Sequence, residues 1–229
     1  MSAGPLLPFQ LFDEKADVSI VERRLPHWSQ PGTIAFITFR THDSMPEAVL
    51  DDWFAERASW LRQHNIDPAT TNWRDRLQDL DQLAVRPFLD RLWNRWHDAL
   101  DEGHGACVLC DRACATIVSQ SLRFFDSQRY LLLDFVVMSN HVHLLAAFPH
   151  EEAMLAQCES WKHYMATQLN RHLGQKGRFW QQDAFDHLVR SEDQFVYLRR
   201  YIADNPRKAH LRPGEFEHYS RPLTPLTPP

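Results

Sequence analysis

The sequence is poor in glycine and contains few cysteines. Seven glycines in 229 residues leave no G-x-G-x-x-G or Walker-type loop, which argues against a glycine-rich nucleotide-binding fold. Four cysteines are too few for the disulfide framework of a small secreted domain. No apolar run approaches the roughly 20 residues that span a bilayer, and Met1–Lys15 lacks the basic-then-apolar order of a signal peptide. We therefore expect a soluble, cytoplasmic protein without membrane contact.

Charge is distributed unevenly along the chain. The net charge of −5 by itself argues against a nucleic-acid partner. From Ser160 onward, however, 11 basic and 7 acidic residues give a balance of +4, so the preceding part carries −9. Hydrophobic residues make up 44% of the chain, which is enough for a sizeable core. A basic C-terminal third inside an acidic chain indicates local attraction to a polyanion.

The pattern of apolar residues, caps and breakers predicts a succession of strands and helices. The expected elements are a strand at 32–40, helices at 46–63, 87–102 and 111–124, strands at 130–138 and 141–148, a helix at 151–173, a strand at 185–190 and a helix from Ser191 to Asn205–Pro206. This order predicts an α+β, ferredoxin-like β-α-β-β-α-β core with an added C-terminal helix. We expect a single domain over 1–211, a helical insertion at about 66–105 in the first crossover, and a Pro-rich tail over 212–229.

Two histidines stand at alternate positions of the strand expected at 141–148. His141 and His143 should share one face of the sheet, and Val142 should point into the opposite layer. Side chains about 7 Å apart on one strand face can converge on a divalent cation. An H-x-H pair without any ligand is the alternative reading of the same residues.

The helix expected at 151–173 carries polar residues beside its apolar stripe. Tyr164 and Gln168 stand four residues apart and should lie on one face of that helix, together with Arg171. If the helix covers the sheet face that carries the histidines, Gln168 adds a third metal ligand and Tyr164 reaches a metal-bound phosphate. A tyrosine attack needs such help, because the phenol is a weak nucleophile at its ordinary pKa near 10. A surface tyrosine beside a core stripe is the alternative.

At this point the sequence resembles a known family. Met138–Leu145, MSNHVHLL, is similar to the MPNHVHLL signature of single-tyrosine HUH (His-hydrophobic-His) transposases, in particular the REP-associated tyrosine transposases. Further similar segments follow in order: RLPHW at 24–28 with FITFR at 36–40, the residues Lys162, Tyr164, Asn170 and Arg171, GRFWQ at 177–181, Phe185–His187 with Arg190, and YIADNPRKA at 201–209. The resemblance runs from about Arg24 to Leu211. Ser139 departs from it, because the family has proline there.

The resemblance implies an HUH-type single-strand DNA endonuclease and strand transferase. In that family a tyrosine attacks a DNA phosphate and forms a 5′-phosphotyrosine link. Carried over to this chain, Tyr164 is the nucleophile, and His141, His143 and Gln168 hold Mg²⁺ or Mn²⁺. The partners implied are single-stranded DNA and DNA hairpins of the palindromic REP type. The family contains both monomeric and homodimeric members, so we expect a monomer or a homodimer.

Basic residues of the C-terminal third are candidates for contact with the DNA backbone. They are Lys162, Arg171, Lys176, Arg178, Arg190, Arg199, Arg200, Arg207 and Lys208. Trp180, with Phe179 beside it, is a candidate for stacking on unpaired bases. Ordinary solvated charge, and a core position for Trp180, are the alternatives.

Three other functions fit parts of the sequence. His104, Cys107, Cys110 and Cys114 have spacings compatible with a zinc site, although the last two fall where a helix is expected. A two-histidine phosphoesterase would use His42 and Ser44 as a second motif, but this pair lacks a symmetric context. A catalytically silent DNA-hairpin-binding protein derived from a transposase is the third.

Overall fold

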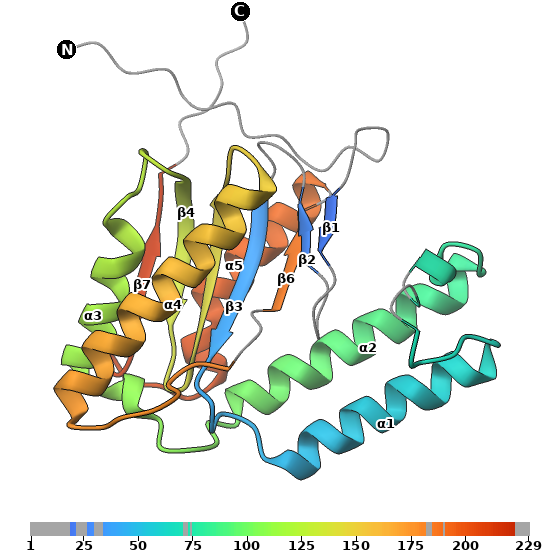
Figure 1. Cartoon of the computed structure of the whole chain (residues 1–229), viewed down its shortest axis with the longest axis horizontal. Helices are drawn as coiled ribbons and strands as arrows, with labels where there is room; N and C mark the ends of the chain where they lie inside the picture. The colour runs from blue at the N-terminus through green and yellow to red at the C-terminus, as the bar shows by residue number, and fades with distance from the viewer. Residues whose placement is uncertain are drawn as a thin grey trace, which may run out of the picture. The chain divides into compact units, whose positions relative to one another are not determined.

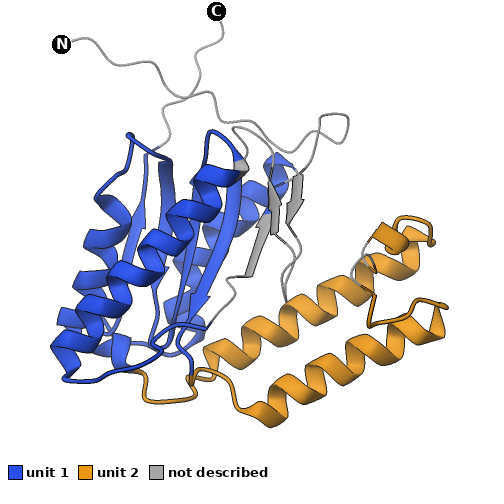
Figure 2. Ribbon diagram, in the orientation of Figure 1, with its two compact units in different colours: residues 1–42, 108–229 blue, residues 43–107 orange. Residues whose placement is uncertain are grey.

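The chain divides into two compact units. The computed structural model describes residues 19–21, 27–29, 34–70, 73, 75–181, 185–189 and 191–222. Unit 1 comprises Met1–His42 and Val108–Pro229, and unit 2 comprises Asp43–Cys107 (Figure 2). None of the helices in these described ranges combines the length and the apolar character that crossing a membrane requires.

The described part of unit 1 contains two sheets, three α-helices and the 3₁₀ helix η3 (Val108–Cys110). Its strands are β1 (Ser19–Val21), β2 (His27–Ser29), β3 (Ile34–Arg40), β4 (Leu131–Val137), β5 (His141–Ala147), β6 (Phe185–Leu188) and β7 (Glu217–Ser220), and its helices are α3 (Arg112–Arg123), α4 (Glu151–Leu173) and α5 (Glu192–Lys208). β1 pairs with β2 in a separate two-stranded sheet. The other five strands form one sheet in the order β6-β3-β5-β4-β7, in which every pair is antiparallel. The first four strands of that order are those of a ferredoxin-like β-α-β-β-α-β core, which confirms the predicted fold class.

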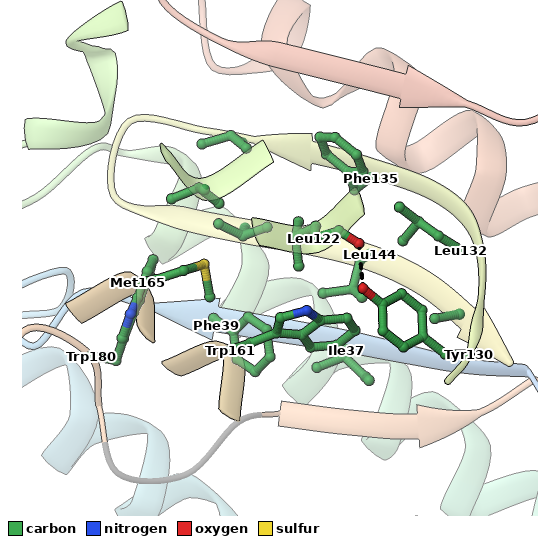
Figure 3. Packing of buried hydrophobic residues seen from close by; sticks show 14 of the residues in the cluster. Ile37, Phe39, Leu122, Tyr130, Leu132, Phe135, Leu144, Trp161, Met165 and Trp180 are labelled. Carbon is green, nitrogen blue, oxygen red and sulfur yellow. Dashed lines mark hydrogen bonds between the residues drawn. The ribbon is translucent and has the colours of Figure 1, made fainter. Parts of the chain in front are cut away.

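The two faces of this sheet are covered by different helices. Figure 1 shows α3 and α4 in front of the sheet and α5 behind it. The main core lies between the sheet and helices α3 and α4. It contains Val142 and Leu144 of β5 together with Trp161 and Met165 of α4. Within it the Tyr130 hydroxyl donates a hydrogen bond to the Leu122 carbonyl over 2.7 Å (Figure 3). The predicted apolar stripe of α4 is therefore confirmed.

Several local signals fix the helix ends as predicted. Gly174 follows α4 with a φ of 65°, a left-handed conformation that glycine adopts without strain. The Ser191 side chain accepts a hydrogen bond from the Gln194 backbone N–H and caps α5. The Asp111 side chain caps α3 in the same way, through the N–H groups of Ala113 and Cys114.

Two predicted helix boundaries are wrong. α2 (Gln82–Asp101) begins five residues before Pro87, because Asp81 caps it through the Leu83 N–H and buried Val85 and Phe88 hold its first turns. α5 runs through Pro206 to Lys208, and Pro206 lies on the buried side of the helix next to Asn205. The expected tail contains a strand, β7, and the expected insertion, 66–105, falls inside a larger unit that begins at Asp43.

Unit 2 is a helical unit with an aromatic core. It consists of α1 (Glu47–Gln63), the short 3₁₀ helix η2 (Asp75–Leu77) and α2. The indole N–H of Trp53 donates to the Leu92 carbonyl over 2.9 Å, and the Trp60 ring stacks on Phe88 at 3.9 Å. Arg57 lies over the rings of Trp53, Phe54 and Trp73, and burial lowers its pKa. Its aromatic residues therefore give this unit a core of its own.

The chain leaves and re-enters unit 1 at one turn. Ser139 and Asn140 join β4 to β5, and the Met138 N–H bonds to the His141 carbonyl over 2.8 Å. The Thr41 N–H, just before unit 2, donates to the Asn140 carbonyl over 2.8 Å. The Leu109 N–H, just after unit 2, donates to the Ser139 carbonyl over 3.0 Å. Both ends of the insertion are thus fixed to neighbouring residues.

Candidate functional site

His141 and His143 lie on the sheet face opposite the main core. Their ring centroids are 4.5 Å apart, and both residues are fully buried. Val142 between them belongs to the main core, so the predicted alternation of β5 is confirmed. Asn140 Oδ1 lies 2.8 Å from His141 Nδ1. A carbonyl oxygen can only accept, so His141 Nδ1 carries the proton and Nε2 carries the lone pair.

His143 is oriented by residues of β3. The Thr38 hydroxyl lies 2.8 Å from His143 Nδ1, and the two residues are direct cross-strand partners. The Phe36 ring stacks on the imidazole with centroids 5.3 Å apart. These contacts hold the ring with Nε2 directed towards α5, the helix that covers this face.

Tyr201 of α5 completes the group of rings. Its hydroxyl lies 3.4 Å from His143 Nε2, and its ring meets the imidazole edge-on at 5.3 Å. The ring also contacts Phe36 at 6.1 Å. Tyr201 is 7% exposed, so its hydroxyl sits at the edge of a buried polar cluster. This cluster of His141, His143 and Tyr201 is the histidine–tyrosine site.

Two more side chains of α5 belong to the same helix face as Tyr201. Asn205 follows one turn later and is fully buried, and neither Oδ1 nor Nδ2 has a hydrogen-bond partner among the described residues. A buried carboxamide without a protein partner is costly, so its oxygen and its N–H groups are available to another group. Lys208 places its ammonium group 5.1 Å from the centroid of the Tyr201 ring.

The donor set suits a divalent cation. Burial lowers the pKa of His141 to about 3, so the imidazole is neutral at pH 7, as a metal ligand must be. Imidazole nitrogens with a carboxamide oxygen match the mixed N and O ligands of Mn²⁺ and related ions. His141 and His143 are therefore residues that could hold an ion, and the Asn205 carboxamide is the oxygen donor that α5 offers on its buried side.

The structure does not bring Tyr164 and Gln168 to the histidines. Both belong to α4, which packs on the opposite face of the sheet through Trp161, Met165 and Leu169. Tyr164 is 53% exposed. The prediction that α4 covers the histidine face is wrong, because its large apolar stripe packs on the apolar face of β5. The histidine face is covered by α5, whose buried side is apolar except for Tyr201 and Asn205.

The predicted DNA-binding residues do not lie on one face. Arg171 lies in the last turn of α4, and Lys176 and Arg178 lie in the loop after this helix, whereas Arg200, Arg207 and Lys208 lie on α5. These six are exposed, and Lys162 on α4 is half-buried. Only the α5 residues are on the helix that carries Tyr201. Arg190 lies outside the described residues.

Three residues that were candidates for DNA contact have structural roles instead. Trp180 is 4% exposed and lies in the main core, with its ring 6.3 Å from Phe39 (Figure 3). Phe179 is 5% exposed in the same core, so neither ring is a platform for bases. Arg199 bonds Asp134 through Nε over 2.8 Å and also reaches the Ser220 hydroxyl.

The cysteines do not gather as the alternative zinc site requires. Cys114 is fully buried in the core of unit 1, where burial raises the pKa of its thiol to about 11. The possible metal-ligand group that includes it in the described part of the chain contains Asp111 and His172, not the other cysteines. Cys107 lies in unit 2 with its thiol 2.9 Å from the Gly103 carbonyl.

The sequence patterns did not assign a role in the site to one of its members, Tyr201, or to three residues around it, Thr38, Asn140 and Asn205. Tyr201 and Asn205 repeat the i, i+4 spacing of Tyr164 and Gln168, so spacing alone did not discriminate between the two helices. The signal that could have identified the correct helix was the polarity of its buried face. Tyr201 and Asn205 interrupt the apolar face of an amphipathic helix, and polar groups on a buried face need polar partners.

Comparisons with known proteins add little. No protein-family model matches the chain, and no curated protein is significantly similar to it. A solved structure of a REP-associated tyrosine transposase bound to a REP hairpin is similar with a TM-score of 0.42 and 11% identity, over 80% of this chain and 71% of that chain. A similarity this weak supports no inference about activity.

Proposed function

We propose that the protein is a cytoplasmic single-strand DNA endonuclease and strand transferase of transposase type, with Tyr201 as its nucleophile. The observation that carries the proposal is the 3.4 Å approach of the Tyr201 hydroxyl to His143 Nε2. It joins two segments whose sequences resemble single-tyrosine HUH transposases, 138–145 and 201–209. Tyr201 takes the role that the sequence assigned to Tyr164, and Asn205 takes that of Gln168.

In the proposed reaction Tyr201 Oη attacks a DNA phosphorus atom. The Oη–P bond forms and the bond from phosphorus to the 3′ oxygen breaks, so the electron pair of that bond leaves with the 3′ oxygen. The phenol proton passes to solvent water, and the 3′ oxygen takes up a proton to become a hydroxyl. The 5′-phosphotyrosine keeps the energy of the original ester, so attack by another 3′-hydroxyl rejoins strands.

Each residue of the site has a defined part in this proposal. Asn140 and Thr38 fix the orientation of the histidine rings, which keeps the donor nitrogens in place. His141, His143 and Asn205 would hold Mg²⁺ or Mn²⁺, which when bound polarises the phosphate and orients it for in-line attack. Lys208, over the Tyr201 ring, adds positive charge where the phosphate must approach.

The test is covalent capture of an oligonucleotide. The protein is incubated with Mn²⁺ and a fluorescent DNA hairpin that carries single-stranded flanks, and adducts are separated on a denaturing gel. We expect an adduct with the unaltered protein and with Tyr164→Phe, and none with Tyr201→Phe. An adduct that survives Tyr201→Phe, or one lost in Tyr164→Phe, would contradict the assignment. Hairpin binding without any adduct would favour the catalytically silent binding protein.

A further inference from the structure

One aromatic side chain next to the histidine–tyrosine site, that of Tyr197, is exposed to solvent. Tyr197 stands one turn before Tyr201 on α5, and the two rings are nearly parallel, with an interplanar angle of 26° and centroids 6.4 Å apart. Tyr197 is 52% exposed, whereas Tyr201 is 7% exposed. The stacked pair therefore has an inner ring at the histidines and an outer ring in solvent.

α5 carries cationic side chains beyond the outer ring, although its first turn is acidic through Glu192 and Asp193. Arg200 and Lys208 are exposed on the same helix, and the Lys208 ammonium lies over the Tyr201 ring. An exposed aromatic face combined with nearby cations recognises nucleotides, because the ring stacks on a base and the cations attract phosphates. A purely apolar partner would make no use of these cations.

We propose that Tyr197 is the stacking platform for an unpaired DNA base next to the phosphate that reaches Tyr201. This inference rests on the proposed function and adds the residue that selects single-stranded over paired DNA at the site. A paired base has its faces covered by its neighbours in the duplex, so it offers no free face to the ring. An unpaired base beside the reacting phosphate does.

The experiment measures binding separately from chemistry. All variants carry Tyr201→Phe, so that no covalent adduct forms, and affinity is measured by fluorescence anisotropy with two labelled oligonucleotides. One is a DNA hairpin with single-stranded flanks, and the other is the same hairpin with a blunt end. Tyr164→Ala is the matched control, because Tyr164 is 53% exposed but lies on α4.

We expect Tyr197→Ala to weaken binding of the flanked hairpin by about 5- to 100-fold, the range for removing one base–aromatic stack. Binding of the blunt hairpin should change less than about 2-fold, as should binding of either DNA by Tyr197→Phe or Tyr164→Ala. Equal losses for both oligonucleotides, or no loss with Tyr197→Ala, would overturn the platform.

The two proposals fail in different ways. If the flanked hairpin binds and forms an adduct through Tyr201, but its affinity does not change in Tyr197→Ala, only the proposal of a stacking platform is wrong. If mass spectrometry of protein with both tyrosines intact finds the DNA attached to Tyr197, that residue is a nucleophile and the platform is again wrong. If binding depends on Tyr197 but no adduct forms, the proposed endonuclease activity is wrong, and the proposed base-binding role of Tyr197 is supported.

Discussion

The Tyr201 hydroxyl and the His143 Nε2 atom lie 3.4 Å apart, although 58 positions separate these residues in the sequence. The contact exists because β5 turns His143 away from the main core and α5 covers that face. The site is thus built on one strand and one helix, both of which are rigid elements. Predictions about its stability follow from the contacts around it.

Thr38 is expected to matter for folding as well as for site geometry. Thr38→Val keeps the shape of the side chain but removes the hydroxyl beside His143 Nδ1, which leaves a buried ring nitrogen without this partner. We expect a loss of about 1–3 kcal/mol in the free energy of unfolding, measured by urea denaturation. Thr38→Ser keeps the hydroxyl and should lose less. Equal losses in both variants would show that the methyl group, not the hydrogen bond, is responsible.

Asp134 is expected to anchor α5 and β7 to the sheet. Its buried carboxylate accepts two hydrogen bonds from Arg199 and one from the Ser220 hydroxyl. Asp134→Ala leaves the guanidinium without its counter-charge, so we expect a loss of about 3–5 kcal/mol in unfolding free energy. The control is Asp204→Ala, which removes the exposed partner of Arg207 at 3.9 Å and should cost at most about 0.5 kcal/mol. Similar losses in the two variants would contradict this.

The stability of the protein should fall as the solution becomes acidic. Burial lowers the pKa of His141 to about 3, while the ring in the unfolded chain takes up a proton near its ordinary value of 6.5. Between these values the unfolded state binds one more proton, so the free energy of unfolding decreases by up to about 1.4 kcal/mol per pH unit as pH falls. Above pH 6.5 this contribution is constant.

The measurement compares urea midpoints between pH 7.5 and pH 4.5 for the unaltered protein and His141→Asn. The variant should show a shallower dependence, smaller by about one proton. His218, whose pKa is also lowered by burial, contributes in the same direction in both proteins and cancels in the comparison. Parallel pH profiles would mean that the fold does not lower the pKa of His141.

Cys114 is expected to be chemically silent. The thiol is fully buried, and burial together with the Asp111 charge raises its pKa to about 11, so little thiolate exists at pH 8. Iodoacetamide should label the partly exposed Cys107, Cys110 and Cys158 well before Cys114, as followed by peptide mass spectrometry. All four should react in urea. Early labelling of Cys114 in the folded protein would contradict its placement in the core.

Local patterns predicted the fold far better than they predicted the site. Apolar runs, Gly174 and the Ser191 cap placed most elements, because these signals act over a few residues. The alternation of β5 also showed that His141 and His143 share a face. It did not show which helix covers that face, since two helices offered a tyrosine with a polar residue four positions later. That choice depends on packing between distant segments.

The turn at Ser139 and Asn140 has a consequence for engineering. Its two carbonyls hold the chain where it departs at Thr41 and where it returns at Leu109, so the cut ends of an excised helical hairpin would already lie together. A short flexible linker should then bridge 42 and 108 at small entropic cost. Such a minimised protein would be the simplest host in which to graft other modules onto the sheet of unit 1.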